Sequence, residues 1–354
     1  MTRTTLHRLP KFALFLLIAC LCACQTPPPP PPVVVQPKAP PPAPVHDNSA
    51  ELARDAAFQN LVAMQDRLYR VAAPLLLNNL NLCQRRAYLL GFTAKNKYSY
   101  SNEFVDSAAK ILSLGDQLQI MGVMPGSGAA SVGLKNGDKL VAIGEVQLPQ
   151  GPSAEMQARG VLTSLLSEKT SIGMTVNRNG QDMSLQVPLT HVCAFSMEVG
   201  NTDTVDAYAD GHRVLLTRGM MKAFMSDDEL ATVIAGEMAR NALDQPTKLH
   251  NAGAMADTVD NLSRVHPDLD KLPKTKPPGE DADLAADKRA LYMLARAAYP
   301  FEDYAKFWSR IAPQGGPADA YVAQHPLTPR RTAAMARVIA EIKDKQAKHK
   351  AIQP

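Results

Sequence analysis

The sequence predicts an α+β protein in which a β-rich segment is followed by a mainly helical segment with a small sheet. Two observations identify the β-rich segment. The residues 120–143 alternate short apolar runs with glycine-containing turns, and Asn179-Gly180 is a typical two-residue hairpin turn. Further along the chain a helix is predicted at 227–240, which begins with an acidic run. Strands followed by helices along the chain favour the α+β class.

The first 23 residues are predicted to be a secretion signal, because three basic residues precede an apolar run at 12–19. Leu21-Cys-Ala-Cys24 then resembles a bacterial lipobox in which Cys24 carries the lipid. Gln25 follows, where Asp would be associated with retention in the inner membrane. We therefore expect a lipid anchor in the bacterial outer membrane, on the periplasmic face. The alternative is an ordinary cleaved signal.

A tether and a long helix are predicted next. Eleven of the 28 prolines lie between Pro27 and Pro44, which favours an extended polyproline II segment. The helix should run from Asn48 to about Ala73, because apolar residues recur there at spacings of three and four. These residues are Leu61, Met64, Leu68, Val71 and Leu75.

The net charge gives no indication of a nucleic-acid partner. The formal charge of +4 falls to +1 once the three basic residues of the signal are removed. The cysteines point to an oxidising compartment, because Cys83 and Cys193 remain as a pair after the signal and the lipidated residue are set aside. We expect a disulfide between them; the alternative is two buried free thiols.

The β-rich segment resembles a PDZ domain. The resemblance rests on the strand, turn and short helix within 120–143, on a helix near 153–167 and on the hairpin at Asn179-Gly180. It implies that Leu90, Gly91 and Phe92 form the loop that captures a peptide carboxylate, and that the adjacent strand edge binds an extended peptide.

The helix at 227–240 carries a motif that is incomplete for catalysis. In H-E-x-x-H, two histidines on one helical face bind zinc and the glutamate acts as general base. Here the histidine positions are Gly236 and Arg240, and only Glu237 remains. Glycine has no ligand to donate, and an arginine stays protonated. We therefore expect Glu237 to be a vestigial base and no metal to be bound at this helix.

Four segments in order resemble the HtpX- and BepA-like gluzincin metallopeptidases. They are an edge strand within 205–220, the acidic entry to the motif helix, Asp283-Leu-Ala-Ala-Asp287, and His325-Pro-Leu-Thr-Pro-Arg-Arg331. The resemblance covers about 195–340 and implies that Asp283 stands where the family has its third zinc ligand, a glutamate. It also implies that Asp287, His325 and Arg331 support the cleft. A zinc site rebuilt from other histidines, His212, His250, His266 and His325, is the alternative.

A further hypothesis concerns Arg240. Glu237 and Arg240 lie three residues apart on the helix, and the resemblance places Asp283 opposite them. Two facing carboxylates without a metal would repel, so the guanidinium would supply the missing positive charge. The alternative is that Arg240 points to solvent and that the site decayed at random.

The sequence therefore leaves three hypotheses for function. The favoured one is a pseudoprotease that binds unfolded or extended envelope polypeptides through the PDZ-like domain and the vestigial cleft. The second is an active zinc endopeptidase of envelope protein quality control, with substitute ligands and zinc as its cofactor. The third is a structural partner in an envelope assembly. The predicted parts are a signal peptide (1–23), a lipidated tether (24–47), a helix (48–84), a PDZ-like domain (85–192), a metallopeptidase-like domain (193–345) and a tail (346–354).

Overall fold

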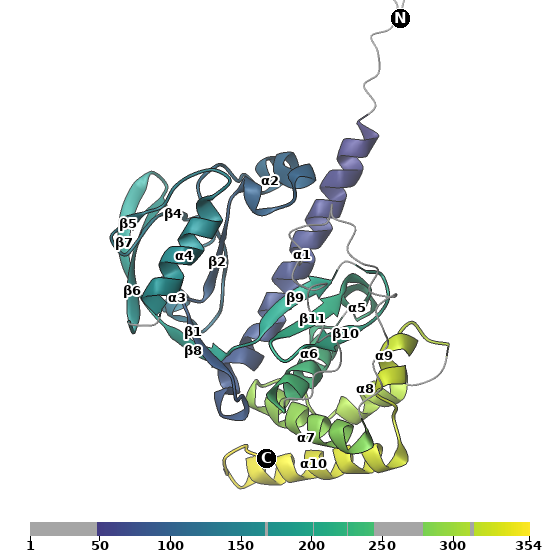
Figure 1. Cartoon of the computed structure of the whole chain (residues 1–354). Helices are drawn as coiled ribbons and strands as arrows, with labels where there is room; N and C mark the ends of the chain where they lie inside the picture. The colour runs from purple at the N-terminus through teal and green to yellow at the C-terminus, as the bar shows by residue number, and fades with distance from the viewer. Residues whose placement is uncertain (1–47, 167–168, 201, 225, 244–278, 312–314) are drawn as a thin grey trace, which may run out of the picture. The chain divides into compact units, whose positions relative to one another are not determined.

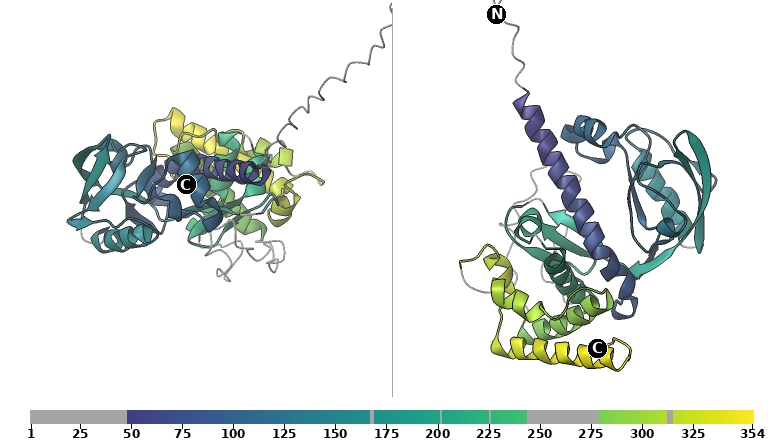
Figure 2. Two further views of the ribbon diagram at one scale, coloured as in Figure 1. Left: turned by 90° about the horizontal axis from the view of Figure 1, so that it is seen from above. Right: turned by 180° about the vertical axis from the view of Figure 1, so that it is seen from behind.

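A computed structural model describes residues 48–354, apart from 167–168, 201, 225, 244–278 and 312–314. The predicted signal, Cys24 and the tether lie outside these residues, as do His250 and His266. The described chain combines helices with three separate sheets (Figures 1 and 2), which confirms the prediction of a mixed helical and sheet fold. Within the described ranges, no helix is long and apolar enough to cross a membrane.

The first element is the long helix α1, Ser49–Asn78. Its predicted apolar stripe is buried at Leu61, Leu68 and Leu75. The helix continues past Pro74, beyond the predicted end at about Ala73. Pro74 lacks the N–H that would donate to the carbonyl of Arg70, four residues earlier. The Tyr299 hydroxyl donates to the adjacent carbonyl, that of Val71.

A six-stranded antiparallel sheet forms the β-rich segment, with β2-β3-β4-β6-β7 in order and β5 beside β4. Asn179 and Gly180, both with positive φ, form the tight turn between β6 and β7, as predicted. Buried side chains such as Ile120, Leu140 and Val176 fill the space between the sheet and its helices. The elements are β2 (Phe92–Lys95), β3 (Gln119–Val123), α3 (Gly128–Ser131), β4 (Lys139–Ile143), β5 (Val146–Gln147), α4 (Ala154–Leu166), β6 (Ser171–Arg178) and β7 (Gln181–Pro188).

The connection from β2 to β3 contains helix α2 (Val105–Leu112), preceded by two short 3₁₀ helices at Lys97–Ser99 and Asn102–Phe104. Sequence analysis did not anticipate it. Aromatic side chains of this connection pack against Phe58 of α1. The centroids of the Phe58 and Tyr100 rings lie 4.8 Å apart. The insertion therefore joins the β-rich segment to α1.

A two-stranded ribbon begins and ends the β-rich segment. Strand β1 (Arg86–Leu89) pairs antiparallel with β8 (Thr190–Cys193). Cys83 and Cys193 form a disulfide at one end of this ribbon, which confirms the predicted pairing. The 3₁₀ helix Leu80–Leu82 connects α1 to the bonded Cys83. The bond thus links the two ends of a segment of more than 100 residues.

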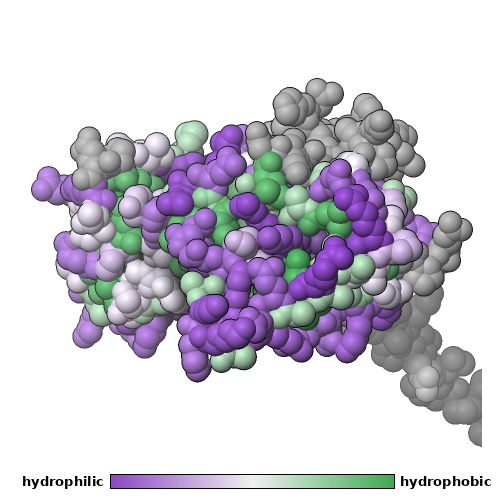
Figure 3. Space-filling view, turned by 90° about the horizontal axis from the view of Figure 1, so that it is seen from below, coloured by the Kyte–Doolittle hydropathy of each residue, from purple (hydrophilic) through white to green (hydrophobic). Residues whose placement is uncertain are grey.

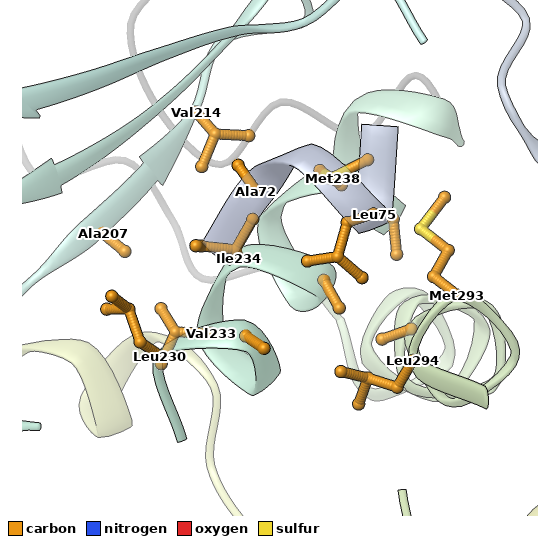
Figure 4. Packing of buried hydrophobic residues seen from close by; sticks show 14 of the residues in the cluster. Ala72, Leu75, Ala207, Val214, Leu230, Val233, Ile234, Met238, Met293 and Leu294 are labelled. Carbon is orange, nitrogen blue, oxygen red and sulfur yellow. The ribbon is translucent and has the colours of Figure 1, made fainter. Parts of the chain in front are cut away.

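The remaining chain is mainly helical around a three-stranded sheet of order β10-β11-β9. Helix α6 is its centre: Figure 4 shows Leu230, Val233 and Ile234 between residues of α1, the sheet and α7. Hydrophilic side chains cover most of the face in Figure 3, with apolar residues in small patches. The elements are β9 (Ser196–Gly200), β10 (Ala207–Ala209), β11 (Arg213–Thr217), α5 (Arg218–Ala223), α6 (Asp227–Ala242), α7 (Glu280–Arg296), α8 (Tyr304–Ile311), α9 (Asp319–Gln324) and α10 (Pro329–Ala347).

The predicted tail at 346–354 packs back onto the helices. The carbonyl of Ile352 accepts a hydrogen bond from Arg296, and Lys345 donates to the carbonyl of Gln353. Ile352 also contacts the main hydrophobic core. The last residues are therefore part of the folded unit.

Candidate functional site: a buried charge cluster

Helix α6 places Glu237 and Arg240 in the protein interior. The hydroxyl of Ser226 caps the helix by accepting a hydrogen bond from Asp228 N. Acidic residues fill the first turn, where their negative charge interacts favourably with the helix dipole. Every residue from Leu230 to Ala242 is buried, because α1, α7 and the sheet surround the helix. Glu237 has no exposed surface and Arg240 is 2% exposed.

Arg240 contacts both carboxylates that the sequence placed around it. Its Nη2 lies 2.9 Å from Asp283 Oδ1, and its Nε lies 3.7 Å from Glu237 Oε1. Burial opposes the charged guanidinium, but the charges of Glu237 and Asp283 outweigh burial and raise the pKa of Arg240. The alternative in which Arg240 points to solvent is therefore wrong.

His325 approaches the same carboxylate from another direction. Its Nδ1 lies 3.1 Å from Asp283 Oδ1. Burial, together with the charge of Arg240, lowers the pKa of His325 to about 3, so the ring is neutral at pH 7 and Nδ1–H is the donor. Burial raises the pKa of Asp283, but the His325 hydrogen bond and the charge of Arg240 prevail and hold it below its usual value. Asp283 is therefore an ionised acceptor.

Tyr321 of α9 completes the cluster. Its hydroxyl donates to Glu237 Oε1 at 3.2 Å. The same hydroxyl is 3.8 Å from where a Cβ at Gly236 would lie. Gln324 holds α9 in this position because its amide donates to both oxygens of Asp206, at 3.3 and 3.1 Å. A short helix thus covers the motif positions of α6.

A second buried ion pair lies on the next turn of α7. Arg331 binds Asp287 with two parallel hydrogen bonds, Nε to Oδ2 at 2.6 Å and Nη2 to Oδ1 at 2.9 Å. Tyr304 adds a hydrogen bond to Asp287 at 2.9 Å, and the Arg331 guanidinium lies 4.0 Å from the Trp308 ring centroid. Arg331 also donates to the carbonyl of His325 at 2.6 Å, so this pair fixes the segment that carries His325.

These residues do not fit a zinc ion. Gly236 offers no ligand, and Arg240 puts a cation where the motif needs a lone pair. Among the residues that the structure describes, no three His, Cys, Asp or Glu side chains are placed to hold a metal together. Of the two substitute histidines that the structure describes, His212 is on the surface beside Arg85, 3.2 Å away, and His325 reaches the cluster.

Leu90, Gly91 and Phe92 lie at the start of β2, far along the chain from this cluster. Gly91 has a φ of +88°, and its carbonyl accepts from Met124 N at 2.8 Å and from Ser127 Oγ at 3.2 Å. A Cβ at Gly91 would lie 2.1 Å from the Ser127 Cβ, so only glycine fits this turn. Leu90 is buried in the core of the sheet.

Sequence analysis identified Glu237, Arg240, Asp283 and His325 but missed Tyr321. It also missed the partners of Arg331, namely Tyr304 and Trp308. No signal in the sequence marks these aromatic residues, because their roles depend on how α8 and α9 pack against α6 and α7.

Comparison with known proteins adds little to this description. No protein-family model matches the chain, and none of the curated proteins compared matches it. Among solved structures, the chain is similar to the HtrA3 PDZ domain bound to a phage-derived ligand, FGRWV. That likeness has 17% identity and a TM-score of 0.22, and covers 30% of this chain and 89% of that one. A TM-score this low assigns neither fold nor function.

Proposed function

We propose that this protein is a non-hydrolytic, lipid-anchored peptide-binding protein of the bacterial envelope, a pseudoprotease with a PDZ-like domain. The observation that carries the proposal is the contact of Arg240 with Asp283 at 2.9 Å, in a cluster where Glu237 has no exposed surface. The PDZ-like segment is the binding part. The vestigial cleft was also predicted to bind polypeptides. That role stays a prediction, because the side chains at its centre, Glu237, Arg240 and Asp283, are buried.

The buried cluster supports the non-hydrolytic half. A general base must come within hydrogen-bond reach of the group that it activates. Glu237 instead accepts from the Tyr321 hydroxyl and lies beside Arg240 in the interior. Without acidic zinc-bound water, a lone carboxylate in this setting supplies little of the chemistry that amide hydrolysis needs.

The edge of β2 supports the peptide-binding half. β2 is the terminal strand of its sheet, and Phe92–Lys95 are all half-buried. Phe92 pairs with Val123, while Met124 N donates to Gly91 O. In an antiparallel ladder this makes Phe92 a non-hydrogen-bonded pair member, so its N–H and C=O point away from β3. The pairing shifts register between Thr93 and Ala94, with Met121 of β3 as the extra residue, so β2 itself stays continuous and its period of two gives Ala94 the same orientation. An extended peptide can pair with these groups.

A substitution at Ala94 tests this edge directly. Ala94→Pro removes the outward-facing donor without taking a hydrogen bond from the β2–β3 ladder, whereas Ala94→Val keeps the donor and serves as the matched control. Substitutions at Gly91 are less informative, because a side chain there collides with Ser127.

The full mature chain would be titrated with fluorescent peptides selected from an array of C-terminal and internal sequences. We expect Ala94→Pro to weaken binding roughly two- to tenfold, the equivalent of one main-chain hydrogen bond, and Ala94→Val to bind like the parent. If both variants bound peptide equally well, the edge of β2 would not be the binding site. Absence of any sequence-dependent binding would favour a structural partner, and peptide cleavage would favour the active endopeptidase.

A further inference from the structure

We infer that two side chains of this chain, Arg240 and Tyr321, together replace the metal ion that an H-E-x-x-H helix would hold. Arg240 supplies the charge and Tyr321 fills the space. The inference rests on the non-hydrolytic half of the proposed function and goes beyond it. It assigns each of the two side chains a separate role and says what must change before a metal can bind.

The charge role follows from the positions of the carboxylates. Glu237 and Asp283 come from neighbouring helices, α6 and α7, and both are buried. Buried carboxylates that face each other need a cation or a proton between them. Arg240 lies 2.9 Å from Asp283 Oδ1 and 3.7 Å from Glu237 Oε1, so one guanidinium serves both helices. Its fixed charge makes the contact independent of any bound ion.

The space role follows from Gly236, the first ligand position of the motif. Among the described residues, the atom nearest to a Cβ built there is the Tyr321 hydroxyl oxygen, at 3.8 Å, and none of their other heavy atoms outside its own helical turns lies within 4 Å. A methyl group therefore fits beside Tyr321. A histidine ring, which extends several ångströms further than a methyl group, competes with the Tyr321 hydroxyl for the same space.

Three contacts hold Tyr321 in place. Gln324 binds Asp206 on the sheet side, and His325, the residue after α9, hydrogen-bonds to Asp283. The Tyr321 ring also stacks on Trp308, with centroids 5.6 Å apart. Because neighbours on several elements fix α9, Tyr321 does not simply swing aside when the residue at 236 is enlarged.

The charge role is tested by a double-mutant cycle on the full mature chain. Arg240→Met keeps the length of the side chain but removes its charge, and Asp283→Asn removes the partner. We expect each single variant to lower the denaturation midpoint, and the double variant to lose less than the two losses combined. Arg240→Lys, which keeps the charge, should lose less than Arg240→Met. Simple additivity, or an unchanged midpoint in Arg240→Met, would overturn the charge role.

The space role is tested by zinc binding. The ligand set is restored in a triple variant, Gly236→His with Arg240→His and Asp283→Glu, and in the same variant with Tyr321→Ala added. We expect the addition of Tyr321→Ala to tighten zinc binding by at least about tenfold. Tyr321→Phe, which removes only the hydroxyl, should give a smaller gain. Equal zinc affinity with and without Tyr321 would overturn the space role.

A third arm needs no variant and remains informative if the variants fail to fold. The natural mature chain, denatured in excess zinc and in excess chelator, should show the same midpoint in both. A midpoint that rises with zinc would overturn the replacement of the metal. Peptide binding is measured on the same samples, so a failure of the β2 site and a failure of this inference are seen separately.

Discussion

Arg331 is a single residue that is fully buried and held by several polar and aromatic contacts. It has no exposed surface, and its guanidinium is matched by two oxygens of Asp287, by a carbonyl and by an aromatic face. Arginine provides the planar, multiple donors that such a site requires. The side chain of its neighbour Arg330 is 59% exposed and pairs with Glu280 and Asp281, whose side chains are 35% and 85% exposed. We therefore expect these two adjacent arginines to contribute very differently to the free energy of unfolding.

We predict that Arg331→Ala lowers the free energy of unfolding by about 3–5 kcal/mol, because it leaves the Asp287 carboxylate buried without its partner. Arg330→Ala is the matched control and should cost far less, because solvent screens an exposed ion pair. Chemical denaturation of both variants checks this. Similar losses in the two would show that Asp287 is compensated by other groups.

His325 should make stability depend on pH. Its pKa is lowered in the folded state to about 3 from its ordinary value of 6.5, so the unfolded chain binds a proton that the folded chain does not. The stabilisation is complete above pH 6.5 and is lost as pH falls toward 3. We predict a slope of up to about 1.4 kcal/mol per pH unit between pH 6 and 4.

The measurement is the free energy of unfolding across this pH range, in the parent and in two variants. His325→Gln should flatten the slope, whereas His349→Gln, at an exposed residue, should leave it unchanged. A slope that survives in His325→Gln would assign the pH dependence to other groups.

At the scale of elements, the glycines of two helices differ in the space around them. Of the residues with described positions, a Cβ at Gly236 of α6 would meet the Tyr321 hydroxyl alone, at 3.8 Å, whereas a Cβ at Gly219 of α5 would lie 2.1 Å from the carbonyl oxygen of Asp203. Glycine inside a helix costs about 0.5–1 kcal/mol relative to alanine. Whether a substitution by alanine recovers that energy depends on whether the added methyl group has room.

We predict that Gly236→Ala raises the free energy of unfolding by about 0.5–1 kcal/mol, and that Gly219→Ala lowers it. Thermal denaturation of the two variants provides the comparison. Destabilisation by Gly236→Ala would mean that Tyr321 packs more closely over α6 than described, and would weaken the account of the cluster.

Elements with local signals were predictable from sequence. The acidic entry to α6 and the Asn179-Gly180 turn act over a few residues, and both form where expected. Helices α2 and α9 were missed, because they are short and depend on contacts with α1 and α6. The contact of Arg240 with Glu237 was predictable from spacing on one helix, and its contact with Asp283 only from the family resemblance. The covering Tyr321 was not predictable, since it lies 84 residues from Glu237 along the chain.

At the scale of the whole molecule, α1 contacts both the inserted segment and the helical core. Lys110 of α2 forms ion pairs with Glu51 and Asp55 near one end of α1. Arg67, further along, donates to Asp227 at the start of α6 at 2.8 Å. One helix therefore connects the region that we propose binds peptides with the helix that carries the buried cluster.

The disulfide should contribute to the stability of this arrangement. It joins residues 110 apart, and the chain-entropy model assigns such a loop about 4–5 kcal/mol. We predict a loss of that order in the double variant Cys83→Ser with Cys193→Ser, measured by denaturation. Alkylation of the unreduced parent should label neither cysteine; quantitative labelling of both would contradict the bond.

We also predict that Cys24, which lies outside the described residues, attaches the mature protein to the outer membrane. Its lipobox and Gln25 are the basis of this prediction. Cys24→Ala should move the protein from the membrane fraction to the soluble fraction and abolish labelling with a tagged fatty acid. Unchanged fractionation would leave an ordinary cleaved signal as the better interpretation.

The central claim is that the mature protein binds peptides without a metal and without cutting them. Native mass spectrometry of the purified mature protein, incubated with a peptide selected from the array, tests this claim most directly. The account predicts a complex whose mass equals one chain plus the intact peptide, with no zinc. A mass that includes one zinc ion per chain, together with cleaved peptide, would contradict it.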